Sequence, residues 1–523
     1  IKRVEVVKNP GARYDASVKA VIRIITKKAA GEGFGFNNRF VTRHRRTYGW
    51  TTLDQFNFNY RKGGFDLSGT LFGGKFRSGN NQQLGMITYL DKLWEQEIDA
   101  RDGKNTESNV QGVLSLNYQF NEKHSMGVRY DMDKYFNTIS DWRFKTNVYT
   151  DKELYETNVS TMLGEYPSTK HSLNYYYNGQ IGDWNIDFNA DGLWNIKEET
   201  QHTREVTNGD TEANVNTFNK NDGTLYATKL VVSYPLWQGS LSFGGEYSHT
   251  DRSNIYINQE GILADDDSRI KEGSTGAFID YSRSFGKVDV QAGIRYENVN
   301  FDYYEQGKHI DEQSRMFNNV FPSLNMNFPI GKAQVQLSYS GGITRPSYDM
   351  LRSNTYYSNK YTYQTGNPFL KPVINQDINL SASYKWINFS FIYNHIKDDI
   401  IQISEPYSDT NPTISLLNII NAKSYNNIIS SVTLSPTISW WNPQFMAQVY
   451  KQWFHIDGKD GELTLSKPRM TLVWRNSFTL PAGFLFDIDG TYYTKGHIQN
   501  MYMGINSLDV SMGLYKSFFK ERL

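Results

Sequence analysis

The chain has 523 residues, of which 15% are aromatic, and its 55 basic and 55 acidic residues give a formal net charge of zero. This balance gives no electrostatic reason to expect nucleic acid as a partner, and the lack of cysteine excludes disulfide frameworks, thiolate zinc sites and cysteine nucleophiles. No apolar run of about 18 residues occurs, which excludes ordinary transmembrane helices. A membrane barrel stays possible, because its strands face lipid with only every second residue.

Residues 1–28 predict two β-branched strands, VEVV and AVIRIIT, joined by a turn at Asn9, Pro10 and Gly11. This opening is strongly basic, since residues 1–46 contain twelve Lys and Arg against three acidic residues. A first longer strand is expected at about 33–42.

From there on, the dominant period of the sequence is two. In residues 288–297, one face carries Val288, Val290, Ala292, Ile294 and Tyr296, and the other carries Asp289, Gln291, Gly293, Arg295 and Glu297. The same split recurs in 333–340 and 377–384. Such alternation predicts strands with one apolar and one polar face.

Short turns and long polar stretches alternate along the chain. The short turns fall at 62–64, 121–123, 182–183, 235–239, 286–287, 329–332, 385–387, 441–443, 481–483 and 519–522, and the long stretches include 75–110, 133–170, 196–224 and 250–272. A soluble sandwich would instead show a turn about every 8–12 residues. Short turns at one end and long loops at the other predict an all-β fold, a transmembrane antiparallel β-barrel.

The turns also predict a strand number. Ten short turns imply about 20 strands in this chain, and an open sheet edge is not tolerated in hydrocarbon. We therefore expect a barrel of 22 strands over residues 29–523, with the last strand pair beyond Leu523.

Asp265, Asp266 and Asp267 form a candidate calcium site in the expected outer loop 250–272. Calcium takes about six to eight oxygen ligands. Adjacent residues rarely converge on one ion, so a solvated acidic loop is the alternative.

The stretch 345–372 is a candidate ligand-binding loop, because tyrosines give broad amphipathic contact at low entropic cost to sugars, peptides or aromatic siderophores. Its candidate contact residues are Arg345, Tyr348, Tyr356, Tyr357, Tyr361 and Tyr363. The alternative is that these tyrosines pack the loop or belong to the interfacial aromatic girdle. Stretch 75–110 with Trp94 is a second candidate.

No catalytic arrangement is found in the sequence. The nine histidines are dispersed without metal-ligand spacing, and neither an HExxH nor a GxSxG motif occurs. We expect neither an enzyme nor a cofactor.

Several stretches resemble TonB-dependent outer-membrane receptors. The opening IKRVEVVKNPGARYDASVKAVIRIITKK is similar to the end of their plug domain, and GIRYE (293–297), FPSLN (321–325), ITRPSYDML (343–351) and GNPFLKPVINQDINLSASY (366–384) are similar to their barrel. The ARYDA variant looks most like the Bacteroidota branch, the "outer membrane β-barrel family". One departure is Ala20-Val21-Ile22-Arg23, where the family pattern has Gly-Gly-Val-Ile-Asn.

The resemblance implies that residues 1–28 are the C-terminal end of a plug domain in the outer membrane of a Gram-negative bacterium. Arg13, Asp15, Arg23 and Lys27 would then contact the polar barrel wall. The alternative is that some of the basic residues face the periplasm, above all the pair Lys27 and Lys28. It also implies TonB-dependent uptake of a scarce or large solute (an iron chelate, oligosaccharide, peptide or cofactor). The implied partners are the TonB complex, outer-membrane lipid, the solute and a possible surface lipoprotein. The alternative function is a structural barrel that scaffolds a cell-surface complex without transport.

Overall fold

The computed structural model describes residues 3–8, 11–25, 31–89, 91–458 and 461–517. Almost all of them lie in strands, and one 3-10 turn, Pro481–Gly483, joins two of these strands. Over these described ranges, no helix has the length and apolar character needed to cross a membrane.

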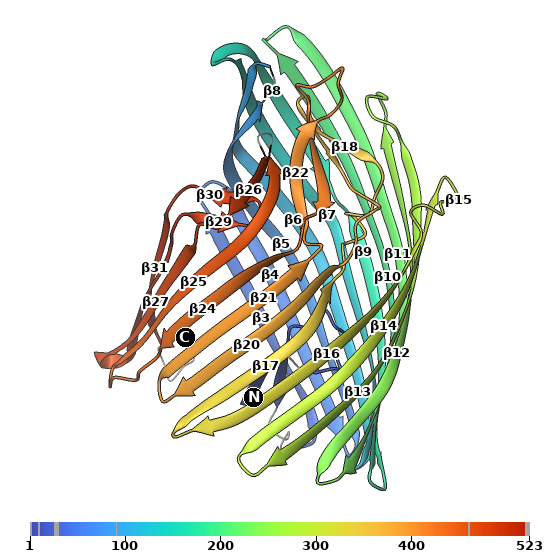
Figure 1. Cartoon of the computed structure of the whole chain (residues 1–523), viewed down its shortest axis with the longest axis vertical. Coiled ribbons are helices and arrows are strands. Elements are labelled where there is room, and N and C mark those ends of the chain that lie inside the picture. Colours follow the sequence, from blue (N-terminus) through green and yellow to red (C-terminus); the bar gives the residue numbers. More distant parts are fainter. Residues whose placement is uncertain (1–2, 9–10, 26–30, 90, 459–460, 518–523) are drawn as a thin grey trace.

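Most strands form one large antiparallel barrel wall, in which each strand pairs with the next one along the chain (Figure 1). The wall strands are β3 (Gly33–Arg45), β4 (Gly49–Lys62), β5 (Phe65–Tyr89), β6 (Leu93–Asn121), β7 (His124–Thr150), β9 (Ser168–Ile181), β10 (Trp184–Thr207), β11 (Thr211–Leu236), β12 (Gly239–Asn258), β13 (Asp266–Phe285), β14 (Val288–Glu305), β16 (Arg315–Ile330), β17 (Ala333–Thr344), β20 (Val373–Tyr384), β21 (Ile387–Lys397), β24 (Tyr425–Leu434), β25 (Trp441–Gly458), β27 (Arg469–Leu480), β28 (Phe484–Tyr493) and β31 (Ser507–Lys516).

Successive ladders lead from β3 to β31, and within the described ranges no ladder joins these two end strands to each other. The total of 22 strands and the division at residues 28 and 29 stay predictions.

The alternation of side chains decides which face of the wall meets lipid. In the ladder between β13 and β14, Ile279 of β13 pairs with Ile294 of β14, and both side chains are about half exposed on the outer face. Arg295, the next residue of β14, is buried on the inner face. Successive side chains of a strand point to opposite faces, so the observed pairing register places the alternating apolar residues of such a strand together on the outer face. The polar set then lines the lumen.

The long polar stretches are mainly strands, which corrects the expectation of long loops at 75–110, 133–170, 196–224 and 250–272. β5, β6 and β7 have 25, 29 and 27 residues, whereas crossing the hydrocarbon takes about 9–11 residues. In the outer halves of these strands, polar side chains occur on both faces. The sequence there has no alternation of polar and apolar residues, so a strand cannot be recognised from its pattern. Backbone ladders need no particular side chain and continue regardless.

Smaller strands extend or fill the outer end of the barrel. β8 (Glu153–Glu165), β15 (Lys308–His309) and β26 (Gly461–Leu465) add to wall strands, and β29 (Gly496–Ile498) pairs with β30 (Met501–Met503). The sheet here called the loop sheet consists of β18 (Thr355–Asn359), β19 (Thr362–Thr365), β23 (Ser415–Asn421) and β22 (Ile400–Pro406). It is built from the two connections that follow β17 and β21.

Most buried apolar clusters form where the loop sheet and its flanking segments meet the wall. One joins Leu351 and Leu370 to Phe301 and Tyr303 of β14. Another joins Tyr357 and Tyr363 to Val215 of β11. A further small cluster, Ala12 with Val231 of β11 and Phe278 of β13, lies away from the loop sheet, where the N-terminal segment meets the wall.

Residues 3–25 form a separate N-terminal hairpin of β1 (Arg3–Lys8) and β2 (Ala20–Ile25), which pair from Arg3↔Ile25 to Lys8↔Ala20. The two predicted opening strands are thus confirmed. Figure 1 shows this N-terminal end within the lower part of the barrel.

Candidate functional site

The candidate site is the contact between the connecting loop of the N-terminal hairpin, residues 11–19, and the inner face of the barrel wall. Two backbone contacts fix the loop at Ala16. The amide N of Ile343, in β17, donates to the carbonyl O of Ala16 at 3.1 Å, and the amide N of Ala16 donates to Oε1 of Glu297 at 3.2 Å.

Arg295 of β14 lies at the centre of this contact and is 2% exposed. Its Nε donates to Oε1 of Glu297 at 2.5 Å, one Nη donates to Glu246 of β12, and the same Nη lies 3.8 Å from Oδ2 of Asp15. Lys229 of β11 pairs with Glu246 at 3.0 Å. Buried charges are tolerated only when paired in this way.

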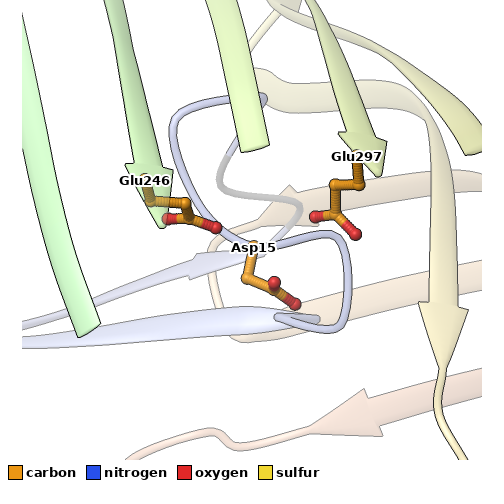
Figure 2. A group of neighbouring side chains, drawn as sticks. All are labelled: Asp15, Glu246 and Glu297. Atoms are coloured by element: carbon orange, nitrogen blue, oxygen red, sulfur yellow. The ribbon is translucent and has the colours of Figure 1, made fainter. Parts of the chain in front are cut away.

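Asp15 is the contribution of the hairpin to this group. Figure 2 shows its side chain beside those of Glu246 and Glu297, and one oxygen of each of the three lies within 4.8 Å of the others. Arg345 bridges two of them, because one Nη lies 3.3 Å from Oδ1 of Asp15 while the other donates to Glu297. We call Asp15, Lys229, Glu246, Arg295, Glu297 and Arg345 the ion cluster.

The protonation state of Asp15 depends on these cations. Burial on its own would raise the pKa of the Asp15 carboxyl. The positive charges of Arg345 and Arg295 and the hydrogen bonds that Ser17 donates lower it, and together they hold that pKa below its ordinary value. Asp15 is therefore ionised at neutral pH, and three carboxylates face three cations across the hairpin–wall contact.

Two glycines of the wall allow the hairpin to come this close. A Cβ on Gly293 would lie 2.8 Å from the Cβ of Ala12 and 2.7 Å from Oδ2 of Asp280. A Cβ on Gly342 would lie 3.1 Å from the carbonyl O of Ala16. Side chains at these positions would push the hairpin away from the wall.

The predicted contacts of the hairpin have three different outcomes. Arg13 and Asp15 do contact the wall, Arg13 through Asp187 of β10 at 3.8 Å. Arg23 does not pair with the wall among the described residues, and instead donates to the hydroxyl of Tyr14 within the hairpin at 3.2 Å. Lys27 lies outside the described residues.

The predicted ligand loop is mostly turned inward, which favours the packing alternative for its tyrosines. Tyr357 donates to Glu205 of β10 and Tyr361 donates to Glu156 of β8, each at 2.7 Å, and Tyr363 packs on Tyr357. The hydroxyl of a buried tyrosine usually finds a hydrogen-bond partner. Here the carboxylates of β8 and β10 accept the hydrogen bonds that the tyrosine hydroxyls donate.

The remaining loop candidates are also engaged. Arg345 belongs to the ion cluster. Tyr348 lies under Arg252 at 5.6 Å, and burial raises the pKa of its hydroxyl to about 12. Tyr356 lies under Arg352 at 4.2 Å, and Trp94 is buried against Val148 and Tyr361.

The structure does not bring the three carboxylates of the calcium candidate together. Asp266 is buried and accepts hydrogen bonds from Asn254 and Ser268, whereas its neighbours Asp265 and Asp267 are exposed. Asp266 and Asp267 are adjacent residues of β13 and point to opposite faces. Asp265 precedes that strand, and its carboxylate accepts a hydrogen bond from the amide N of Asn258.

Sequence reasoning missed most of the ion cluster. Arg295 and Glu297 lie in the GIRYE stretch and on the predicted polar face, but that face alone assigns them no partner. Glu246 is 49 residues from Arg295, and only the register of β12, β13 and β14 brings the two together.

Comparison with known proteins gives one family and a group of similar structures. Residues 182–523, more than half of the chain, match the model of the outer membrane protein beta-barrel family. A search of curated proteins finds no match.

Solved structures are similar over 99% of this chain. They include the siderophore receptor PirA from Pseudomonas aeruginosa (12% identity, 80% of that chain, TM-score 0.57) and the alcaligin outer-membrane receptor FauA from Bordetella pertussis (11%, 77%, 0.56). A double mutant of the hemophore receptor HasR from Serratia marcescens, in complex with its hemophore HasA and heme, gives 9% identity, 81% of that chain and a TM-score of 0.60. At these identities the likeness establishes a common fold.

Proposed function

This chain belongs to the outer membrane protein beta-barrel family, and we propose that it takes up a scarce or large solute across the outer membrane in a TonB-dependent manner. In this proposal residues 1–28 are the end of a plug and residues 29–523 are the barrel. The family places the chain in the outer membrane; the Bacteroidota branch stays a prediction.

The observation that carries the proposal is the way in which the hairpin is held in the lumen. The contact is made mainly by charged and polar groups, namely the ion cluster, the Arg13–Asp187 pair and two hydrogen bonds of the Ala16 backbone. Beside them lies one small apolar cluster, in which Ala12 packs on Val231 and Phe278 of the wall. Charged groups that separate in a polar lumen regain hydration, whereas an apolar contact would lose its hydrophobic stabilisation. A mainly polar contact therefore suits a segment that must leave the wall and return.

The proposed solute class is carried over from the names of the similar receptors. Their names specify a siderophore in one case, alcaligin in the second and a hemophore with heme in the third. In this chain the loop sheet is docked on the wall through Glu156 and Glu205. TonB would supply the force on the hairpin, and the lipid and a surface lipoprotein would be further partners.

Depletion of solutes from the medium tests this function. Cells that carry the full-length protein, cells that lack it and cells that lack TonB are compared by mass spectrometry of the spent medium. We expect at least one solute to be depleted only when both the protein and TonB are present. Depletion that persists without TonB, or no solute that depends on the protein, would contradict the proposal, and the second result would favour the scaffold alternative.

A further inference from the structure

We propose that a cavity beside the N-terminal hairpin binds the carboxylate of a small hydroxylated acid between Lys19 of the hairpin and Arg469 of the wall. This inference rests on the proposed uptake function and specifies the chemical class of its solute.

The cavity has a volume of about 420 Å³ and is lined by the hairpin, the wall and the segment that follows β29. Ligand pockets for small molecules commonly span about 300–1,000 Å³. It lies among the inner faces of β20, β25 and β27, so a solute bound there touches both the fixed wall and the hairpin.

One side of the cavity is a network of polar groups that hold one another in place. Tyr425 donates to Oδ2 of Asp399 at 2.7 Å, and the side-chain amide of Gln499 donates to the same oxygen at 2.9 Å. Gln452 is fully buried and bonds both the amide N and the carbonyl O of Gln499 at 2.7 Å. These groups are preorganised, so they can meet solute hydroxyls at little entropic cost.

The other side presents positive charge. Arg469 stacks on the ring of Tyr493 at 4.9 Å, and its Nε is buried with no hydrogen-bond acceptor among the described residues. Within the same ranges Arg469 forms no ion pair, unlike the guanidinium groups of the ion cluster. Lys19 lines the cavity from the hairpin and also interacts electrostatically with Asp377 of β20.

A carboxylate is the group that these cations recognise best. A guanidinium presents a planar fork that matches a carboxylate with two parallel hydrogen bonds, and an ammonium adds a point charge. The neighbouring tyrosine, glutamine and aspartate groups suit hydroxyls. A hydroxylated acid would thus bridge Arg469 and Lys19, and its arrival would change the charge around the hairpin.

Binding of D-glucuronate and D-glucose to the purified full chain in detergent tests the inference, because the two sugars differ only at C6, which is a carboxylate in glucuronate and a hydroxymethyl group in glucose. We expect calorimetry to show glucuronate binding at least about tenfold tighter than glucose, the loss that one charged hydrogen bond implies. Arg469→Gln should weaken glucuronate binding by a similar factor, and Lys19→Gln should weaken it less. Arg475→Gln is the matched control, because Arg475 lies six residues along the same strand, on the same face and outside the cavity.

Equal binding of the two sugars, no binding of glucuronate, or equal losses for Arg469→Gln and Arg475→Gln would overturn the inference. The assay contains no TonB and measures no transport. A negative result here would leave the proposed uptake intact, whereas failure of the depletion experiment would leave a measured glucuronate site in place.

Discussion

Replacing Arg295 with methionine is expected to free the N-terminal hairpin from the barrel wall. The substitution keeps the length of the side chain but removes the cation that joins Asp15, Glu246 and Glu297. The three carboxylates would then face one another with only Arg345 and Lys229 beside them. Removing one partner of a buried ion pair costs roughly 3–5 kcal/mol, which is large for a contact whose apolar cluster is as small as Ala12, Val231 and Phe278.

Single-channel conductance in planar bilayers measures this release, because a displaced hairpin opens the lumen. We expect channel openings to be far more frequent for the Arg295→Met protein than for the unaltered protein. The control is Arg101→Met, because Arg101 forms an exposed pair with Asp99 and such pairs contribute little. Equal conductance of the two variants, with both barrels folded as judged by heat-dependent gel mobility, would show that the ion cluster does not hold the hairpin.

The Gly293→Val substitution is expected to displace the hairpin by steric pressure without changing any charge. A Cβ at this position would meet Ala12 and Asp280 at 2.8 and 2.7 Å, closer than carbon atoms approach without a shift. The backbone of the wall strand is fixed by ladders on both sides. The carboxylate of Asp280 can rotate away, but the side chain of Ala12 is a single methyl group that cannot rearrange, so the hairpin has to move as well. Overpacking of this kind costs about 1–3 kcal/mol.

Limited trypsin digestion detects the displacement at Arg13, which is partly buried in the docked hairpin. We expect cleavage after Arg13 to be several times faster in Gly293→Val than in the unaltered protein. Gly223→Val is the matched control, because Gly223 faces the lumen from β11 and a Cβ there has its nearest contact at 3.9 Å. If both variants are cut at the same rate as the unaltered protein, the close approach at Gly293 does not determine docking.

Much of the wall could be predicted from the sequence, because a membrane fixes both the period and the turns. Ile279 and Ile294 have to face lipid, and a shift of one residue would turn them inward. Each strand has to turn back after it has crossed the membrane, which predicts the turn at Gly286 and Lys287. The structure has this turn between β13 and β14.

The outer half of the barrel could not be predicted in this way. Water on both sides imposes no alternation on residues such as those of β6 beyond the membrane, so strands there have the composition of loops. The tyrosines of the loop sheet are ambiguous for a related reason. A ring that would suit a ligand equally suits Glu156 or Glu205, and only the fold decides between them.

The ion cluster could not be predicted from the sequence, because most of its residues lie far apart along the chain and only the pairing of strands brings them together. Polar alternation marks Arg295 and Glu297 as lumenal, but the pairing of Arg295 with Glu246 needs the register of three strands. Its pairing with Asp15 needs the position of the hairpin as well. The residue pattern supplied the expectation of two opening strands, and the similarity to a plug end supplied the expectation that they meet the wall. The structure places Arg13 and Asp15 against the wall and pairs Arg23 with Tyr14 of the hairpin.

The central claim is that the N-terminal hairpin must leave the wall for a solute to pass. Because the chain has no cysteine, an Ala16→Cys and Gly342→Cys pair can lock the hairpin at the position where a Cβ on Gly342 would lie 3.1 Å from the carbonyl O of Ala16. Uptake of the TonB-dependent solute is then measured in cells with the oxidised and the reduced protein, with each single-cysteine variant as control. We predict that uptake stops in the oxidised double variant and returns on reduction. Undiminished uptake through the locked barrel would contradict the claim.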